Sequence, residues 1–236
     1  MSVCDSVSVV SDLDQLDGNV SVCSNTDTRE NIAPDTNYRV HNASVANHLP
    51  VVTVCNMRSF FPKLENFKTY VDISLLCEVW QKAEDKRHMN EIESMLEMDG
   101  LKYFSTMRPK GKRGGGAAII ANQEKFQVEK LDIHIPHKLE IIWALAKPKA
   151  ESAQFKHIIL CSFYSPPRSR LRNRLKDHMV GTLQMLTMKY PGCGILVGRD
   201  KNKMNISSLL NNNLKLKQVV SSPTRKKEIL DIVLTN

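Results

Sequence analysis

The sequence lacks the cysteine spacings that mark zinc sites and redox-active pairs. Its six cysteines lie far apart, and none forms a CxxC pair or a Cys/His zinc spacing. Cys55, Cys77 and Cys161 fall inside apolar runs, and we interpret them as buried free thiols. Cysteines that stay reduced are typical of a reducing compartment. We therefore expect an intracellular protein, and nothing in the sequence chooses between the nucleus and the cytoplasm.

Apolar stretches of membrane length are missing as well. No apolar run approaches the ~20 residues that a helix needs to cross a bilayer. The N-terminal residues include early acids and no apolar core, so we expect no signal peptide. We therefore expect no membrane partner, and no feature of the sequence indicates an obligate protein partner.

Charge is distributed unevenly along the 236 residues. Residues 1–50 carry seven acidic residues and two arginines, a net charge of −5. The whole chain has a net charge of +8, so residues 51–236 carry +13. A basic body favours a polyanionic partner, with nucleic acid, here DNA, as the first choice. Charge alone is equally consistent with a soluble protein that is basic but has no polyanionic partner.

Composition divides the chain into a leader and a body. Residues 1–48 are rich in Ser, Asn, Asp and Val without a sustained period, and we predict a mostly disordered polar leader. A brief alternation at residues 7–10 is too short to indicate a fold. Apolar runs then follow one another without an interior linker, which predicts a single domain over residues 49–236.

The body contains more predicted strands than helices. Strands are predicted at residues 51–55, 73–77, 103–106, 117–121, 128–131, 140–145, 157–163, 194–198 and 229–234. Helical spacing of apolar residues predicts helices at 64–71, 82–98 and 170–189, and a short one near 209–216. The helices interrupt the strands irregularly, which is typical of an α/β fold with mixed sheets.

Polar residues stand where several of these strands end. They are Asn56, Glu78 and Tyr164, and the pair Asp200 and Asn202. Residues i and i+2 of an extended backbone point the same way, so Asp200 and Asn202 would project together from a rigid strand. Two simpler interpretations stay open, since Asp and Asn are ordinary turn residues and Glu78 could be a solvent-facing strand end.

Six short motifs occur in the order seen in endonuclease/exonuclease/phosphatase enzymes. They are Asn56-Met57-Arg58-Ser59, Cys77-Glu78-Val79-Trp80, Arg113-Gly114-Gly115-Gly116-Ala117, Tyr164-Ser165-Pro166-Pro167, Asp200-Lys201-Asn202 and Thr224 through Asp231. From about residue 50 the chain most resembles the endonuclease domain of non-LTR (LINE-type) retrotransposons, whose reading frames also encode a reverse transcriptase. The resemblance implies a four-layer α/β sandwich of two mixed β-sheets flanked by helices.

The resemblance also implies a divalent-metal-dependent endonuclease that nicks DNA, with Mg²⁺ or Mn²⁺ at the strand ends. Glu78 is a hard oxygen ligand of the kind that Mg²⁺ prefers. Asp200 fits the general base that takes a proton from the attacking water. Asn56 and Asn202 suit orientation of the phosphate or a metal-bound water, and the Tyr164 hydroxyl suits donation to the phosphate.

Further positions take roles from the same resemblance. Asp231 matches the family's later acid, which supports the metal or the catalytic histidine. DNA contacts are expected from Arg58, Lys112, Arg113 and Thr224. A merely solvated basic loop around Lys112 and Arg113 remains an alternative.

Glycines and tryptophans near these motifs have ordinary structural interpretations. The run from Gly114 to Gly116 lacks the lysine and serine of a phosphate-binding P-loop, so we interpret it as a tight turn. Trp80 and Trp143 are interpreted as core aromatic residues.

Two departures from the family pattern affect the functional prediction. Arg199 is inserted before Asp200, which suggests a locally reset turn such as a bulge. The Ser-Asp-His sequence expected after Asp231 is missing, because the sequence ends at Asn236 and all seven histidines precede the Asp200 strand. We therefore expect truncated C-terminal strands and weak or no activity. A non-catalytic nucleic-acid-binding remnant, or a phosphoesterase of the same fold acting on a small or lipid phosphate, remains an alternative.

Overall fold

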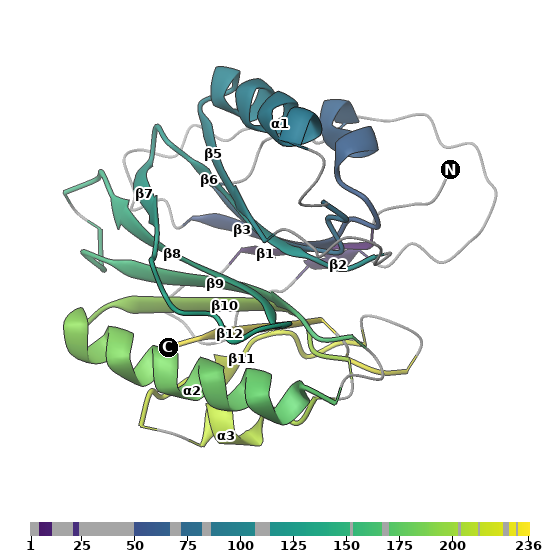
Figure 1. Cartoon of the computed structure of the whole chain (residues 1–236). Coiled ribbons are helices and arrows are strands. Elements are labelled where there is room, and N and C mark those ends of the chain that lie inside the picture. Colours follow the sequence, from purple (N-terminus) through teal and green to yellow (C-terminus); the bar gives the residue numbers. More distant parts are fainter. Residues whose placement is uncertain are drawn as a thin grey trace.

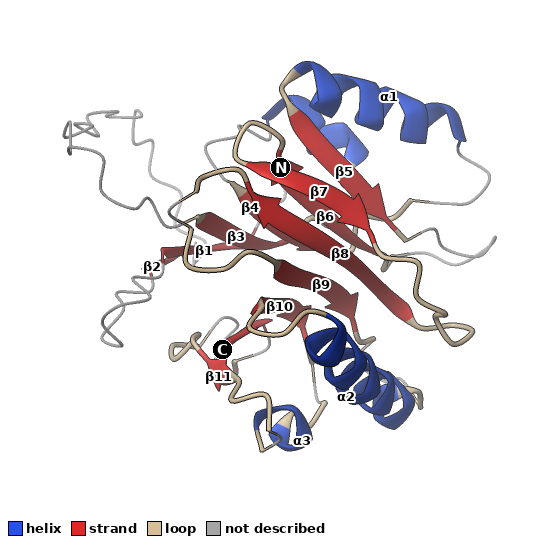
Figure 2. Ribbon diagram, turned by 90° about the vertical axis from the view of Figure 1, so that its left-hand side faces the viewer, coloured by secondary structure: helices blue, strands red, loops and turns tan. Residues whose placement is uncertain are grey.

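Two β-sheets packed face to face, with helices on both outer faces, make up the computed structural model of this chain (Figure 1). The structure describes residues 5–10, 21–23, 50–66, 72–81, 86–106, 114–151, 153–166, 170–202, 204–211, 213–223, 227–229 and 231–236. Figure 2 shows the same layers from the side, with helices above one sheet and below the other. This arrangement confirms the predicted four-layer α/β sandwich.

The first sheet has the strand order β2-β1-β3-β4-β6-β5. Its strands are β1 (Asp5–Val10), β2 (Ser21–Cys23), β3 (Val51–Asn56), β4 (Ile73–Cys77), β5 (Leu101–Ser105) and β6 (Ala117–Asn122). β3 and β4 run parallel and all other neighbours run antiparallel, so the sheet is mixed. All five residues of β4 are buried, as expected of a central strand covered on both faces.

Two strands from the predicted leader extend this sheet beyond β3. β1 pairs antiparallel with β3 along its whole length, from Asp5 opposite Asn56 to Val10 opposite Val51. β2 pairs with β1. The sequence pattern did not predict this pairing. The rest of residues 1–48 lies outside the described residues, so the disorder of the leader and its boundary remain predictions.

The second sheet has the strand order β11-β12-β10-β9-β8-β7. Its strands are β7 (Phe126–Lys130), β8 (Glu140–Pro148), β9 (Ile158–Tyr164), β10 (Gly194–Asp200), β11 (Lys217–Gln218) and β12 (Asp231–Thr235). Here β9 and β10 form the parallel pair. β10 keeps an unbroken one-to-one register with both neighbours through Arg199 and Asp200, so the bulge expected at Arg199 was a wrong prediction.

Helices cover the outer face of each sheet. The 3-10 helix η1 (Phe61–Asn66) and helix α1 (Lys86–Met98) cover the first sheet, and α2 (Arg172–Lys189) and α3 (Ser207–Leu210) cover the second (Figure 1). α1 ends at Met98, as predicted, and Gly100 follows it with a φ of +71°, a conformation that glycine adopts easily. η1 stands where an α-helix was expected at 64–71, and residues 67–71 and 82–85 lie outside the described residues.

Two small residues let the sheets approach closely at the centre of the sandwich. The hydroxyl of Ser162 in β9 donates a buried 2.8 Å hydrogen bond to the carbonyl oxygen of Leu76 in β4. Gly198 in β10 lies so close to the first sheet that a Cβ there would be 2.6 Å from Leu75 Cδ1 and 3.4 Å from Val54 Cγ2. β9 and β10 therefore cross directly over β3 and β4.

The described cysteines agree with the expectation of buried thiols. Cys55, Cys77, Cys161 and Cys193 are buried and form no disulfide. Burial raises the pKa of the Cys161 thiol well above its usual value, which keeps the group protonated and unreactive. No described helix combines the length and apolar character that crossing a bilayer requires.

The contact at Gly198 predicts opposite effects for two glycine substitutions. Gly198→Ala should destabilise the fold by about 1–3 kcal/mol, because the added methyl group overlaps Leu75 in a packed core. Gly181→Ala is the matched control, since nothing lies within 4 Å of the added Cβ in α2. It should stabilise the helix by ~0.5–1 kcal/mol. Urea unfolding monitored by circular dichroism measures both, and equal effects of the two substitutions would contradict the packing described.

Candidate active site

The carboxyl ends of central strands from both sheets meet at one edge of the sandwich. The carboxylate of Glu140, the first residue of β8, accepts a 2.5 Å hydrogen bond from the backbone N–H of Gly116, which directly precedes β6. β8 begins opposite Tyr164, the last residue of β9, and β6 begins opposite the last residue of β4. The bond from Ser162 to Leu76 lies slightly further inside. These two contacts require β4 and β9 to end at the same edge.

One row of polar residues crosses the second sheet at this edge. Glu140 is the register partner of Tyr164, Tyr164 of Asp200, and Asp200 of Asp231. Tyr164 is buried and Asp231 is half-buried, while the side chain of Asp200 lies outside the described part of the structure. Directly opposite residues share a face of a sheet, so Glu140 is a polar member of the row that the sequence pattern did not predict. Its only signal in the sequence was an acid that opens an apolar run.

In the first sheet, Asn56 and Glu78 stand at the ends of neighbouring parallel strands. Asn56 is the register partner of Cys77, so it lies beside the residue that precedes Glu78. The Asn56 Oδ1 accepts a 3.3 Å hydrogen bond from the backbone N–H of Arg58, whose side chain is exposed. The carbonyl oxygen of Glu78 accepts a 2.8 Å hydrogen bond from Ser59 N–H. These bonds hold the two strand ends together.

The backbone of these strand ends is unusually strained. Arg58, Ser59 and Glu78 have φ angles of 43°, 80° and 50°, in the left-handed region that residues other than glycine rarely adopt. Such residues cost roughly 1–3 kcal/mol each and cluster at functional sites of proteins. The strain supports a functional role for the edge that carries Glu78.

Asn202 connects the segments that follow β9 and β10. It is buried, and its Nδ2 donates a 2.6 Å hydrogen bond to the carbonyl oxygen of Ser165. Its φ of 46° is left-handed, which asparagine tolerates better than most residues. This amide therefore positions the loops beside Asp200 and Tyr164.

The remaining predicted residues have mixed outcomes. Lys112, Arg113 and Thr224 lie outside the described residues. Trp143 is a core residue as predicted, with 1% of its surface exposed. Trp80 is 43% exposed, so its interpretation as a core aromatic was wrong. Trp80 lies two residues after Glu78. A single apolar position in a sequence does not show whether its side chain is buried, so the exposure of Trp80 was not predictable.

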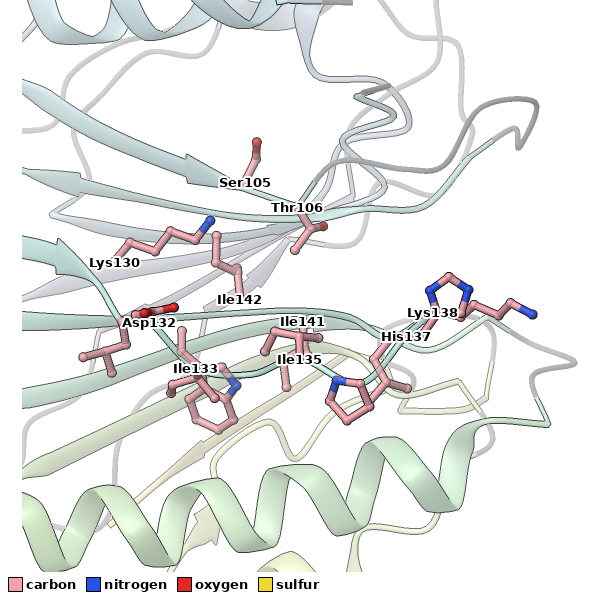
Figure 3. A pocket seen from close by; sticks show the side chains of 14 residues that line it. Ser105, Thr106, Lys130, Asp132, Ile133, Ile135, His137, Lys138, Ile141 and Ile142 are labelled. Atoms are coloured by element: carbon pink, nitrogen blue, oxygen red, sulfur yellow. The ribbon is translucent and has the colours of Figure 1, made fainter. Parts of the chain in front are cut away.

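Two cavities flank the edge. One of about 690 Å³ lies beside β8, with Thr106 from the end of the first sheet and Ile142 on the inner face of β8 at one side, and Ile141 on the face toward α2 at the other (Figure 3). Most residues of the segment 131–139 line it, and Lys130 and Lys138 are among its polar lining residues. The other, of about 530 Å³, is lined by Lys201, Asn202, Ile206, Gln218, Glu228, Ile229 and Ile232.

A histidine on α2 supports the wall of the larger cavity. The Nε1–H of Trp143 donates a 3.4 Å hydrogen bond to Nε2 of His178. Burial lowers the pKa of His178 below its usual value, and the positive charge of His134 lowers it further. The neutral form of His178 is therefore the one that fits this contact, because only an unprotonated nitrogen accepts the bond.

The donor atoms at the edge suit a hard divalent cation. Among the described residues no group of three or more His, Cys, Asp and Glu side chains could hold a metal ion. The candidate donors at the strand ends are oxygens of Glu78, Asn56 and Asp231. Mg²⁺ binds through one or two carboxylates and keeps several waters, and Mn²⁺ also prefers oxygen. The residues therefore fit Mg²⁺ or Mn²⁺ better than zinc.

Sequence comparison identifies no relative, whereas structural comparison finds proteins of similar fold. No protein-family model and no curated protein matches the sequence. The human Nocturnin catalytic domain with bound sulfate is similar over 75% of this chain and 73% of its own, with 15% identity and a TM-score of 0.54. A mannosyl-6-phosphatase from Bacteroides thetaiotaomicron is similar over 75% and 76%, with 14% identity and a TM-score of 0.52.

A retrotransposon protein is also among the similar structures. The endonuclease domain of TRAS1, a telomere-specific non-LTR retrotransposon, matches 78% of this chain and 82% of its own. The identity is 15% and the TM-score is 0.50. At such low identity the likeness establishes a common fold and leaves the substrate open.

The lowered pKa of His178 predicts a pH-dependent part of the stability. The unfolded chain binds a proton at this residue near pH 6.5, whereas the folded chain resists it. Stability from this group is therefore complete above about pH 6.5 and is lost as the pH falls through the lower folded pKa. His178→Gln keeps a hydrogen-bond acceptor and should remove this loss. Urea midpoints at several pH values between 7.5 and 5 measure it, and an unchanged pH slope in the variant would refute the assignment.

Proposed function

The chain has the endonuclease/exonuclease/phosphatase fold, and on that premise we propose that it is a divalent-metal-dependent endonuclease acting on DNA. The observation that carries the proposal is the meeting of Glu78 and Asn56 from one sheet with the polar row of the other at a single edge. Hydrolysis of a phosphodiester needs a base for the water and charge stabilisation for the phosphate, and this edge offers residues of both kinds.

Each residue has a defined task in this proposal. Glu78 holds the divalent cation, which supplies charge neutralisation at the scissile phosphate when it is bound. Asp200 takes the proton of the attacking water, and the Tyr164 hydroxyl donates a hydrogen bond to a phosphate oxygen. Asn56 and Asp231 orient these groups. Asn202 keeps the Asp200 and Tyr164 loops together through its bond to Ser165.

DNA is favoured over a small phosphate by charge. The net charge of +13 outside residues 1–50 would attract a long polyanion, whose binding gains from every neutralised phosphate. Arg58 is exposed beside Asn56, and Lys130 and Lys138 line the cavity at the same edge. These cations are spread over more of the surface than one phosphate group could use.

Two other functions have a specific observation in their favour. The similar mannosyl-6-phosphatase makes a phosphoesterase acting on a small phosphate the second candidate. The net charge of +13 outside residues 1–50 fits equally a nucleic-acid-binding protein without catalysis, which is the third candidate. The assays below separate all three.

The catalytic assignment predicts a loss of nicking in two isosteric variants. Glu78→Gln and Asp200→Asn keep the size of each side chain but remove its charge, so Mg²⁺-dependent nicking of supercoiled plasmid should fall by ~10²–10⁴-fold. Glu91→Gln is the control, because Glu91 pairs with Arg87 on the exposed face of α1. Relaxed plasmid is quantified on agarose gels, with EDTA as the metal-free blank. Undiminished nicking by both variants would refute the assignment.

DNA binding should persist when catalysis is lost. Glu78→Gln should bind a duplex oligonucleotide with an affinity that falls as salt rises, because phosphate neutralisation releases counterions. Arg58→Ala should weaken binding and reduce the salt slope by about one unit. Fluorescence anisotropy between 50 and 200 mM salt, roughly the range over which such slopes are measured, gives both values. Hydrolysis of small phosphate monoesters without salt-dependent DNA binding would favour the phosphoesterase instead.

A further inference from the structure

The side chain of Trp80 is exposed to solvent, although burial of a large apolar side chain would stabilise the fold. Its side chain is 43% accessible, and it is the only Phe, Tyr or Trp side chain that is exposed among the described residues. The other large apolar side chains exposed in the described part of the chain are methionines on helices: Met98, Met185 and Met188. Leaving so much apolar surface in water forgoes burial energy, which calls for a reason at this position.

The backbone that presents Trp80 is fixed on both sides. Trp80 N–H donates a 2.9 Å hydrogen bond to the carbonyl of Gly115, and the carbonyl of the buried Val79 accepts a 3.1 Å bond from Phe60 N–H. Trp80 has a φ of 58°, so both Glu78 and Trp80 have left-handed backbone conformations. The strained turn therefore carries Glu78 and Trp80 on one rigid three-residue segment.

Gly114 lies against one edge of the Trp80 indole ring. A Cβ added at Gly114 would lie 3.4 Å from Trp80 Nε1 and 3.8 Å from Cε2, so the ring edge lies against this residue. This is an ordinary van der Waals contact, whereas a Cβ at Gly116 would lie 2.9 Å from Val79 Cγ2, too close to fit without a shift. The glycine run thus holds the turn without covering the ring.

We propose that Trp80 is a nucleobase-stacking platform beside the Glu78 site, and this inference rests on the proposed function. An unpaired base next to the scissile phosphate stacks on the exposed indole, while the phosphate lies at Glu78. Aromatic stacking is tolerant of sequence because every base has a π-face, and it changes affinity by roughly 5- to 100-fold per base. The preferred ligand is single-stranded or locally unpaired DNA, because bases inside a duplex already stack on each other.

Fluorescence tests the stacking without requiring catalysis. The sequence has two tryptophans, and Trp143 is only 1% exposed, so Trp80 carries the accessible signal. The full chain with Glu78→Gln, in EDTA, is titrated with an oligothymidylate and with an abasic oligonucleotide of equal length and charge. The oligothymidylate should quench Trp80 and protect it from acrylamide, whereas the abasic strand should bind without quenching. The Trp80→Phe variant supplies the Trp143 background.

Equal quenching by the two strands, or none with a bound oligothymidylate, would overturn the inference. These outcomes differ from failure of the proposed function, because the assay does not depend on nicking. A chain that nicks plasmid yet shows no base-dependent quenching refutes the platform alone. If Trp80 fluorescence is quenched but plasmid is never nicked, the stacking proposal is supported and the endonuclease proposal is refuted.

Substitutions provide an independent measure. Trp80→Ala should weaken oligothymidylate binding by about 5- to 100-fold and leave binding of the abasic strand unchanged, and Trp80→Phe should restore part of the loss. Met188→Ala removes another exposed apolar side chain, on α2, and should leave both affinities unchanged. Thermal unfolding shows whether each variant is folded. Trp80→Phe keeps an aromatic ring. If this variant lost equal affinity for the oligothymidylate and for the abasic strand, the result would contradict base stacking.

Discussion

The buried hydrogen bond from Ser162 to the carbonyl of Leu76 is the contact on which the rest of the arrangement depends. It joins a hydroxyl in one sheet to a main-chain oxygen in the other, and a buried polar group left without its partner costs about 1–3 kcal/mol. Gly198 on the adjacent strand permits the close approach that this bond needs. Together they fix how the sheets cross, so the strand ends of both sheets open at one edge.

Strain accumulates at that edge and is held there by hydrogen bonds. Arg58, Ser59, Glu78 and Trp80 all have left-handed φ angles, and backbone bonds between these turns and the glycine segment at Gly115 hold them in place. The core strands behind them supply the stability that such turns lack. A carboxylate and an indole are thereby presented rigidly, which suits a site better than a mobile loop would.

The fold and the substrate are decided by different parts of the molecule. Similar structures at 13–15% identity include a nuclease domain and a phosphatase, so the sandwich alone does not select the substrate. Selection depends on what surrounds the edge. In this chain the surroundings are a basic body, a cavity lined by Lys130 and Lys138, and the exposed Trp80.

Local sequence pattern determined the strands and their polar ends, because an apolar run and its terminal residue are set by neighbours in the chain. β3, β4, β9 and β10 with Asn56, Glu78 and Tyr164 were predictable for this reason. Tertiary structure alone decided the pairing of β1 with β3, the hydrogen bond from Gly116 N–H to the Glu140 carboxylate, and the exposure of Trp80. Each of these depends on which distant segment packs against the residue, and no local periodicity records that.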